Sequence, residues 1–164
     1  METLGDGQPP VTRTPGAPVG VDLTLLADVY AVCRLPAGAP FPVELLPSAS
    51  RPGARARSAA GGGAADSGVV SLTWTPTETS VICRADRVPA GAVVETGWRC
   101  FEVAGPMALT LTGILASIAT PLAHARINIF AFSTFDTDYV LVPSVRLTAA
   151  LAALTGAGHR IKQA

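Results

Sequence analysis

Hydrophobic and polar positions follow their most regular pattern in the second half of the chain. Apolar residues recur there every three or four positions, the spacing that puts side chains on one face of a helix: Leu111, Ile114, Leu115, Ile118 and Leu122. The pattern predicts a helix over residues 110–123. Because its apolar residues share one side, we expect this helix to lie on a core.

A second helix is predicted where Ser144 can cap a segment that carries Leu147, Leu151 and Leu154 along one side. Runs rich in β-branched and aromatic residues predict four strands around the two helices: Trp98–Ala104, Ile127–Ser133, Tyr139–Pro143 and His159–Lys162. The order strand-helix-strand-strand-helix-strand is the split βαβ pattern of a ferredoxin-like α+β fold.

The first half of the chain predicts a shortened copy of this arrangement. Its strands are expected at four short apolar runs: Tyr30–Leu35, Val69–Trp74, Ser80–Ala85 and Ala92–Thr96. Residues 41–46 predict one helical turn, and residues 84–91 are too short and too rich in Pro and Gly for a long helix. We therefore predict two tandem halves, 21–97 and 98–164, of which the first is reduced.

Two segments lie outside this pattern. Residues 1–20 are rich in Gly, Pro and Thr and are predicted to be a disordered tail. Residues 47–68 form a low-complexity insertion with almost no large apolar side chain to offset the entropy of ordering. Its arginines Arg51, Arg55 and Arg57 are predicted to face water in a solvated loop.

The predicted strand Ile127–Ser133 takes an edge position in the usual strand order of this fold. It is apolar on both faces, with Phe130 and Phe132 on one of them. An apolar edge strand promotes aggregation unless another strand pairs with it. We expect that partner to be the equivalent strand Val69–Trp74 or a second chain, which would give one extended antiparallel sheet with helices on one face.

Composition narrows the classes of protein. The 164 residues are 49% hydrophobic and 15% charged with a formal net charge of zero, so nothing indicates a nucleic-acid or anionic-membrane surface. The uncharged stretch Val103–Ala123 is about long enough to span a bilayer, but its helical stripe favours a core helix. Three cysteines without a CxxC pair and no secretion signal predict reduced thiols and a cytoplasmic protein.

Few residues suggest chemistry by themselves. Asp136 and Asp138 lie in the predicted turn TFDTD, where they either stabilise the turn or contact a ligand. Two acids are weak evidence for Ca²⁺, and His124 and His159 stand in separate elements. The sequence offers no matched set of nucleophile, base and orienting group, and Cys100 has no such partners. We therefore predict no enzyme, no metal and no cofactor.

The run GWRCFEVAGPMALTLTGILASIATPLAHARINIFAFSTFDTDYVLVP, over residues 97–143, resembles the small bacterial ACT-domain proteins. These are related to the ACT repeats of the CASTOR arginine sensors. Upstream, LTLL, YAVCRLP and VSLTWTPTETSVIC are similar to the first half of the same family. The resemblance implies two ACT-like halves and a non-catalytic regulatory module that binds a small ligand, most often an amino acid, at an ACT–ACT interface.

The resemblance also implies where such a ligand would lie. On the helix side the matching positions are Leu111, Thr112 and Gly113, and on the turn side they are Thr134, Phe135 and Asp138. The Asp138 carboxylate matches the position that would meet a cationic group of the ligand. The sensors carry four ACT units and this chain about two, so a complete site would need a homodimer. The alternative is a ligand-free dimerisation or adaptor module.

Overall fold

A computed structural model describes residues 20–46, 68–108 and 110–164. The strands are β1 (Asp22–Pro36), β2 (Ser71–Trp74), β3 (Glu78–Arg84), β4 (Val93–Val103), β5 (Phe130–Ser133), β6 (Asp138–Pro143) and β7 (Arg160–Gln163). The helices are α1 (Ile114–His124) and α2 (Leu147–Gly156), with short 3-10 turns η1 (Val43–Leu45), η4 (Ala85–Arg87) and η5 (Ser144–Arg146). The predicted α+β class is confirmed.

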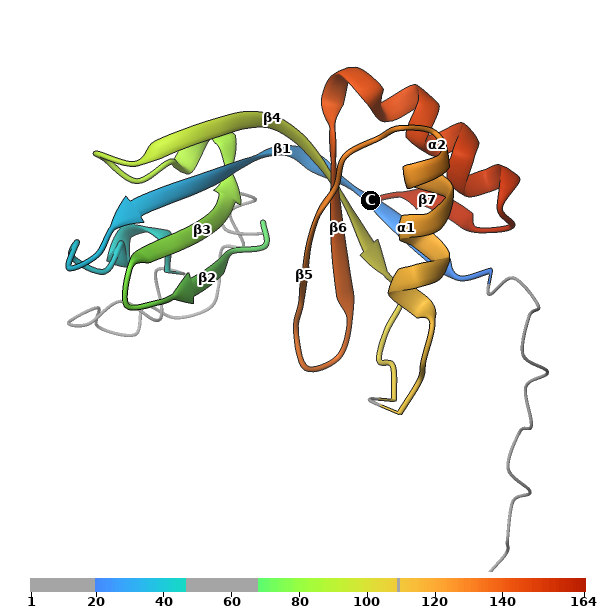
Figure 1. Cartoon of the computed structure of the whole chain (residues 1–164), viewed down its shortest axis with the longest axis horizontal. Coiled ribbons are helices and arrows are strands. Elements are labelled where there is room, and N and C mark those ends of the chain that lie inside the picture. Colours follow the sequence, from blue (N-terminus) through green and yellow to red (C-terminus); the bar gives the residue numbers. More distant parts are fainter. Residues whose placement is uncertain (1–19, 47–67, 109) are drawn as a thin grey trace, which may run out of the picture.

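All seven strands belong to one sheet with the order β2-β3-β1-β4-β6-β5, and β7 pairs with β1. The long strands β1 and β4 run through the whole molecule (Figure 1). One end, the first lobe, carries β2 and β3, and the other, the second lobe, carries β5, β6, β7 and both α-helices. The helices cover one face of the second lobe.

Strand β1 departs most from the sequence-based prediction. Its first residues, Asp22–Leu25, lie between β4 and β7, pairing antiparallel with β4 and parallel with Arg160–Gln163. A simple split βαβ unit would instead place β7 directly beside β4. The segments 92–96 and 98–104, predicted as separate strands, are one strand, so the two lobes share β1 and β4. The division into tandem halves at residue 97 stays a prediction.

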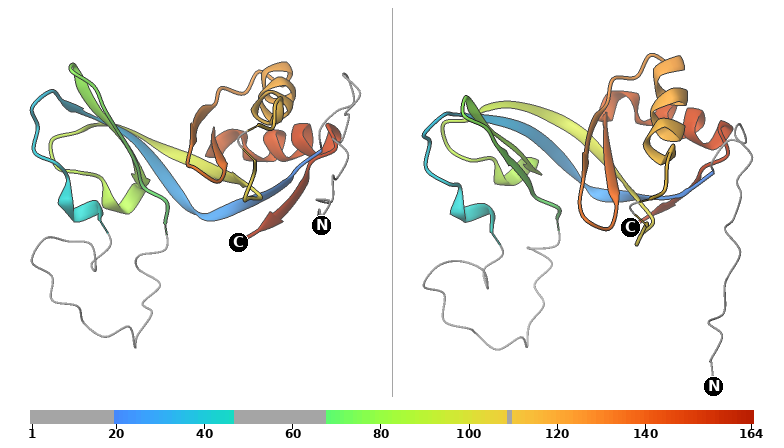
Figure 2. Two further views of the ribbon diagram at one scale, coloured as in Figure 1. Left: turned by 90° about the horizontal axis from the view of Figure 1, so that it is seen from below. Right: turned by 60° about the horizontal axis from the view of Figure 1, so that its bottom comes forward.

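Two irregularities bend this shared ladder. Tyr30 pairs with Trp98 and Ala31 with Thr96, which leaves Gly97 unpaired at a φ of 85°. A second shift falls between Leu25 and Val29. Extra residues in one strand of a pair bend it and increase its twist. Figure 2 shows the resulting angle between the two lobes.

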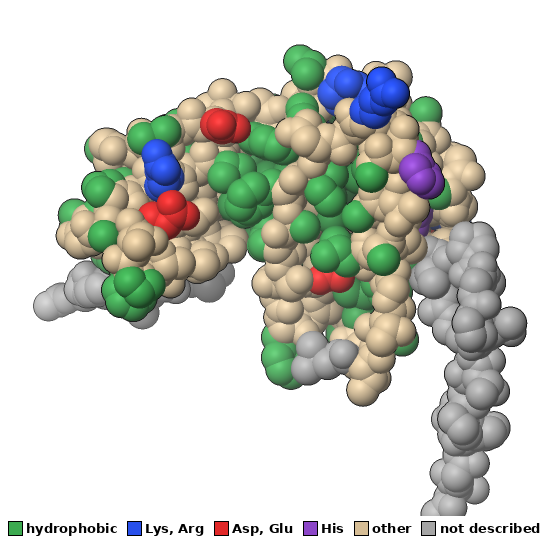
Figure 3. Space-filling view, viewed as in Figure 1, with side chains coloured by type: hydrophobic (Ala, Val, Ile, Leu, Met, Phe, Trp, Pro, Cys, Tyr) green, Lys and Arg blue, Asp and Glu red, His purple; other side chains and the backbone are tan. Residues whose placement is uncertain are grey.

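Three apolar clusters hold the sheet. The largest lies between the helices and the second lobe and includes Phe101, Ile118, Leu122, Val140 and Leu154, all fully buried. The second surrounds Cys33 and Cys83 in the first lobe. The third, built on Tyr30, Trp98 and Leu141, lies at the bend. In Figure 3 hydrophobic side chains fill the surface between the lobes.

The predicted helix over 110–123 is present, but it begins at Ile114. None of the helices in the described ranges is long and apolar enough to cross a membrane. Strand β5 occupies an edge, as predicted, and pairs with β6. The expectation that β2 covers this edge within the chain is wrong, because β2 pairs with β3 at the opposite end of the strand order. The predicted tail and nearly all of the predicted insertion lie outside the described residues.

Candidate functional site

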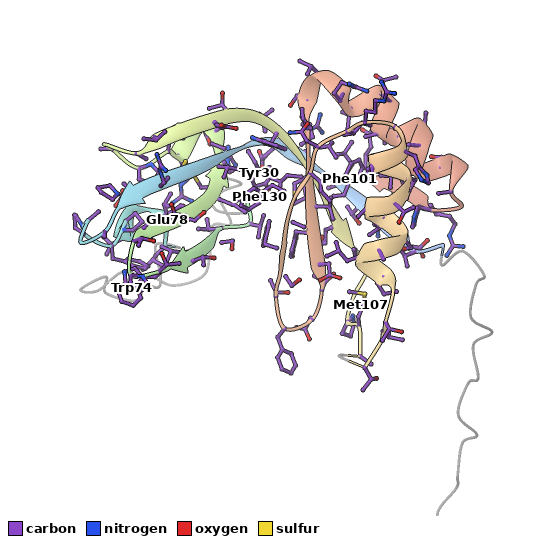
Figure 4. The ribbon with its side chains drawn as sticks, in the orientation of Figure 1. Tyr30, Trp74, Glu78, Phe101, Met107 and Phe130 are labelled. Carbon is purple, nitrogen blue, oxygen red and sulfur yellow. The ribbon has the colours of Figure 1, made fainter. Side chains whose placement is uncertain are left out.

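A pocket of about 320 Å³ lies between the start of α1 and the β5–β6 turn. We call it the α1–hairpin pocket. Its lining comes from the loop and first turn around α1 and from the turn of the hairpin: Met107, Ala108, Leu111, Gly113–Ala116 and Ser133–Asp138. Figure 4 labels Met107 beside this end of α1, and Figure 3 shows hydrophobic and acidic side chains in the hollow. The volume is at the small end of ligand pockets, which suits a small molecule.

Hydrogen bonds join the β5–β6 turn to the loop before α1 and to the end of β4. The Met107 amide donates to the carbonyl oxygen of Asp136 at 2.9 Å, and the Thr137 hydroxyl donates to the carbonyl oxygen of Val103. A side-chain Cβ at Gly105 would lie 2.9 Å from the Asp136 carbonyl oxygen, closer than real Cβ atoms approach. The glycine therefore permits the loop and the turn to touch.

The turn itself is closed by local hydrogen bonds. The Thr134 amide donates to the Thr137 carbonyl at 2.8 Å, and the Thr137 amide donates back to Thr134 Oγ1 at 3.2 Å. At the last pair of the hairpin, the Ser133 hydroxyl donates to Oδ1 of Asp138 at 2.5 Å. This bond fixes one carboxylate oxygen of Asp138 and orients the side chain toward the end of β5.

The start of α1 carries partial positive charge, opposite in sign to the Asp138 carboxylate. Gly113 precedes the helix in the left-handed conformation, with a φ of 82°, and supplies no side-chain cap. The first turn also contains no acidic residue. The first amides of a helix have no acceptor in the preceding turn, so they carry partial positive charge and attract an anion. The amides of Ile114, Leu115 and Ala116 have this position in α1.

The structure brings five of the six residues singled out from the sequence into one pocket: Leu111, Gly113, Thr134, Phe135 and Asp138. Thr112 stands between two of them but is not part of the lining. Their role in binding stays a prediction. Met107 and Ser133, which also line the pocket, were not singled out. The contact of Met107 with the turn is one that no short sequence pattern shows.

His159 and the three cysteines, whose side chains could take part in chemistry, are buried in the fold. His159 is buried, accepts from the Val21 amide at 3.3 Å through Nδ1 and lies 3.0 Å from the Ser117 carbonyl through Nε2. Burial raises the pKa of the Cys83 and Cys100 thiols to about 12. Within the described ranges, no three His, Cys, Asp or Glu side chains are grouped to hold a metal ion.

On the face of the second lobe opposite the two helices, an aromatic side chain makes a polar contact. Tyr139 donates to Oε1 of Glu102 at 2.8 Å, and its ring stacks on Phe132 with centroids 4.9 Å apart. Burial, and then the hydrogen bond to Glu102, raise the pKa of Tyr139. Glu102, which stands within an apolar strand, is thus paired through this hydroxyl.

Comparison with known proteins assigns the family. Residues 93–156 match the ACT domain, a segment that runs from the start of β4 to the end of α2 and contains the whole α1–hairpin pocket. The chain is an ACT-domain protein. Protein Atu0741 from Agobacterium tumefaciens, known from its crystal structure, is 34% identical over 89% of this chain and 95% of its own, with a TM-score of 0.68.

Two further proteins with named functions are similar to this ACT-domain protein, one in sequence and one in fold. The cytosolic arginine sensor for mTORC1 subunit 1 of Bos taurus is 32% identical over 97 residues, which are 53% of this chain and 30% of the sensor. The match therefore spans less than a third of the sensor's length. The regulatory subunit of aspartate kinase from Thermus thermophilus shares the fold, with a TM-score of 0.51 at 12% identity, over 79% of this chain and 93% of its own.

Proposed function

We propose that this ACT-domain protein is a non-catalytic regulatory module that binds a free amino acid in the α1–hairpin pocket. One observation carries the proposal: the uncapped start of α1 and the Asp138 carboxylate border the same hollow. A free amino acid carries a carboxylate and an ammonium group on one carbon atom. The pocket offers a partner of opposite charge for each of them.

In the proposed complex the ligand carboxylate accepts hydrogen bonds from the amides at the start of α1. The ligand ammonium group donates to Asp138. Ser133 already engages Oδ1 of that carboxylate, and a carboxylate has room for several donors, so Asp138 can accept a further bond. The hydrogen bonds between the loop and the turn hold both partners in place before the ligand arrives.

We further propose that the functional unit is a homodimer paired along β5, with the ligand near the ACT–ACT interface. Among the strands in the described ranges, β5 has one neighbour, and the segment 127–133 contains no charged residue to discourage pairing. Two copies paired antiparallel would extend the sheet around a two-fold axis. The related arginine sensor is nearly twice as long as this chain, which fits a site assembled from two copies. The name of that sensor also supports a cytosolic location.

A thermal-shift series with the twenty common amino acids tests the binding function. A ligand that binds only the folded state raises Tm with concentration. Asp138→Asn keeps an acceptor for Ser133 but removes the charge, so it should abolish the shift. Asp86→Asn, in the first lobe beside Arg84, is the matched control and should leave the shift unchanged. If no amino acid raises Tm at millimolar concentration, the protein is the alternative, a ligand-free dimerisation or adaptor module.

A further inference from the structure

The side chains that line the α1–hairpin pocket specify which class of amino acid fits it, provided that the proposed function holds. Asp138 and the start of α1 are assigned to the groups shared by all amino acids, so discrimination falls to the remaining lining. That lining is mostly apolar and includes Met107, Leu111, Leu115 and Phe135. Among the described residues that line it, none is Lys, Arg or His.

Three of these large apolar side chains are exposed to solvent. Leu111 is 48% exposed, Leu115 39% and Phe135 78%. They come from the loop before α1, the first turn of α1 and the hairpin turn, yet they border one hollow. Apolar residues gathered around a pocket mark a surface that gains from being covered.

Charge separates the candidate ligands further. An acidic side chain would meet no cationic group in the part of the lining that the structure describes, and it would add a negative charge near Asp136 and Asp138. A basic side chain could reach only Asp136, which is exposed at the tip of the turn, and an ion pair between exposed groups contributes little. An uncharged apolar side chain instead covers the three exposed residues and removes their surface from water.

We infer that the pocket selects an amino acid with an apolar side chain of the size of leucine, isoleucine, methionine or phenylalanine. Selection comes from Leu111, Leu115 and Phe135, which contact the ligand side chain, whereas Asp138 contacts its ammonium group. An analogue with the same side chain but no ammonium group, such as 4-methylpentanoate, loses the contact with Asp138 and binds more weakly.

Isothermal titration of the full chain with leucine, methionine, phenylalanine, arginine, lysine and glutamate tests this inference. We expect an apolar amino acid to bind at least about tenfold more tightly than any charged one. Leu115 is at an exposed position, and glutamine is a good helix former, so Leu115→Gln should keep the helix. The variant should weaken binding of the apolar ligand by about tenfold, because it removes one apolar contact of this size with the ligand. Val145→Gln, at a position on η5 that is 91% exposed and outside the pocket lining, is the control and should leave binding unchanged.

The outcomes separate the two proposals. Tighter binding of arginine, lysine or glutamate than of any apolar amino acid overturns the inferred ligand class and leaves the amino-acid-binding function standing. Binding of an apolar amino acid that Leu115→Gln does not weaken also overturns the inferred selection. Heat of binding from none of the ligands overturns both, and points to the adaptor function.

Discussion

Nε2 of His159 lies 3.0 Å from the carbonyl oxygen of Ser117, in the first turn of α1. Because Nδ1 accepts a hydrogen bond from the Val21 amide, the ring proton must be on Nε2, which therefore donates to Ser117. This ring joins the start of β1 and the end of α2–β7 to the helix that borders the α1–hairpin pocket. The bond therefore helps to hold the start of the helix in place.

Replacing His159 should destabilise the fold. His159→Phe leaves the Val21 amide and the Ser117 carbonyl without their ring partner, which should lower the free energy of unfolding by about 2–3 kcal/mol. Urea denaturation measures this change. His124→Phe, at an exposed position near the end of α1, should change it by no more than about 0.5 kcal/mol. Equal effects of the two variants would mean that the His159 bridge contributes no specific stability.

Gly105→Ala tests the contact between the two pocket walls. The added Cβ would lie 2.9 Å from the Asp136 carbonyl oxygen, so the loop and the turn must move apart, at a cost of about 1–3 kcal/mol. We expect lower stability together with weaker ligand binding. Gly156→Ala at the end of α2, where no atom lies within 4 Å, is the control and should be neutral or stabilising. Unchanged Tm in Gly105→Ala would contradict the close approach.

A charge on the outer edge of β5 tests the proposed homodimer. Ala131→Lys places a charged side chain in the middle of the edge strand, where it should prevent pairing of two copies. Sedimentation or light scattering should then show a monomer at concentrations where the unchanged protein is a dimer. Thr73→Lys, at an exposed position on the edge strand β2 of the first lobe, should leave the dimer intact. A monomeric unchanged protein at high concentration would exclude the β5 dimer.

The buried thiols should make stability depend on pH at the alkaline end. Burial raises the pKa of Cys83 and Cys100 from 9.0 to about 12, so the folded state keeps protons that the unfolded state releases. Their contribution to stability is complete below pH 9 and is lost as pH rises toward 12. Cys100→Ala should therefore reduce the fall in the free energy of unfolding between these values, measured by denaturation at each pH. An equal fall in the variant would contradict this assignment.

The same burial should protect the thiols from reagents. Cys33, Cys83 and Cys100 are all buried, and thiol–disulfide exchange requires an accessible thiolate. We expect a disulfide reagent such as DTNB to react with none of them in the folded protein at pH 8, and with all three in denaturant. Rapid reaction of one thiol in the folded state would show that its cluster opens readily.

Periodicity and resemblance predicted much of the second lobe. The apolar stripe marked α1 and the apolar run marked β6, because each of these elements shows its buried face within a few residues. Strand β5 was marked by the β-branched and aromatic residues of the segment 127–133, although none of the strand's own residues is buried. The start of β1 was missed because Asp22 and Asp28 interrupt the apolar run. Burial nevertheless alternates there as in a strand, with Leu23 and Leu25 buried and Thr24 not. The bulge at Gly97 and the contact between Met107 and Asp136 depend on strands and loops far apart in sequence, so no local pattern reveals them.

The insertion of β1 between β4 and β7 has a consequence for how the protein is made. Strand β7 pairs with β1, whose residues are synthesised well over a hundred positions earlier. Native pairing of such distant segments is slow, because a long loop must close first. During synthesis β1 therefore has an unpaired edge until β7 is made. A separate fragment of residues 93–156 would lack β1, the strand that completes the sheet beside β4.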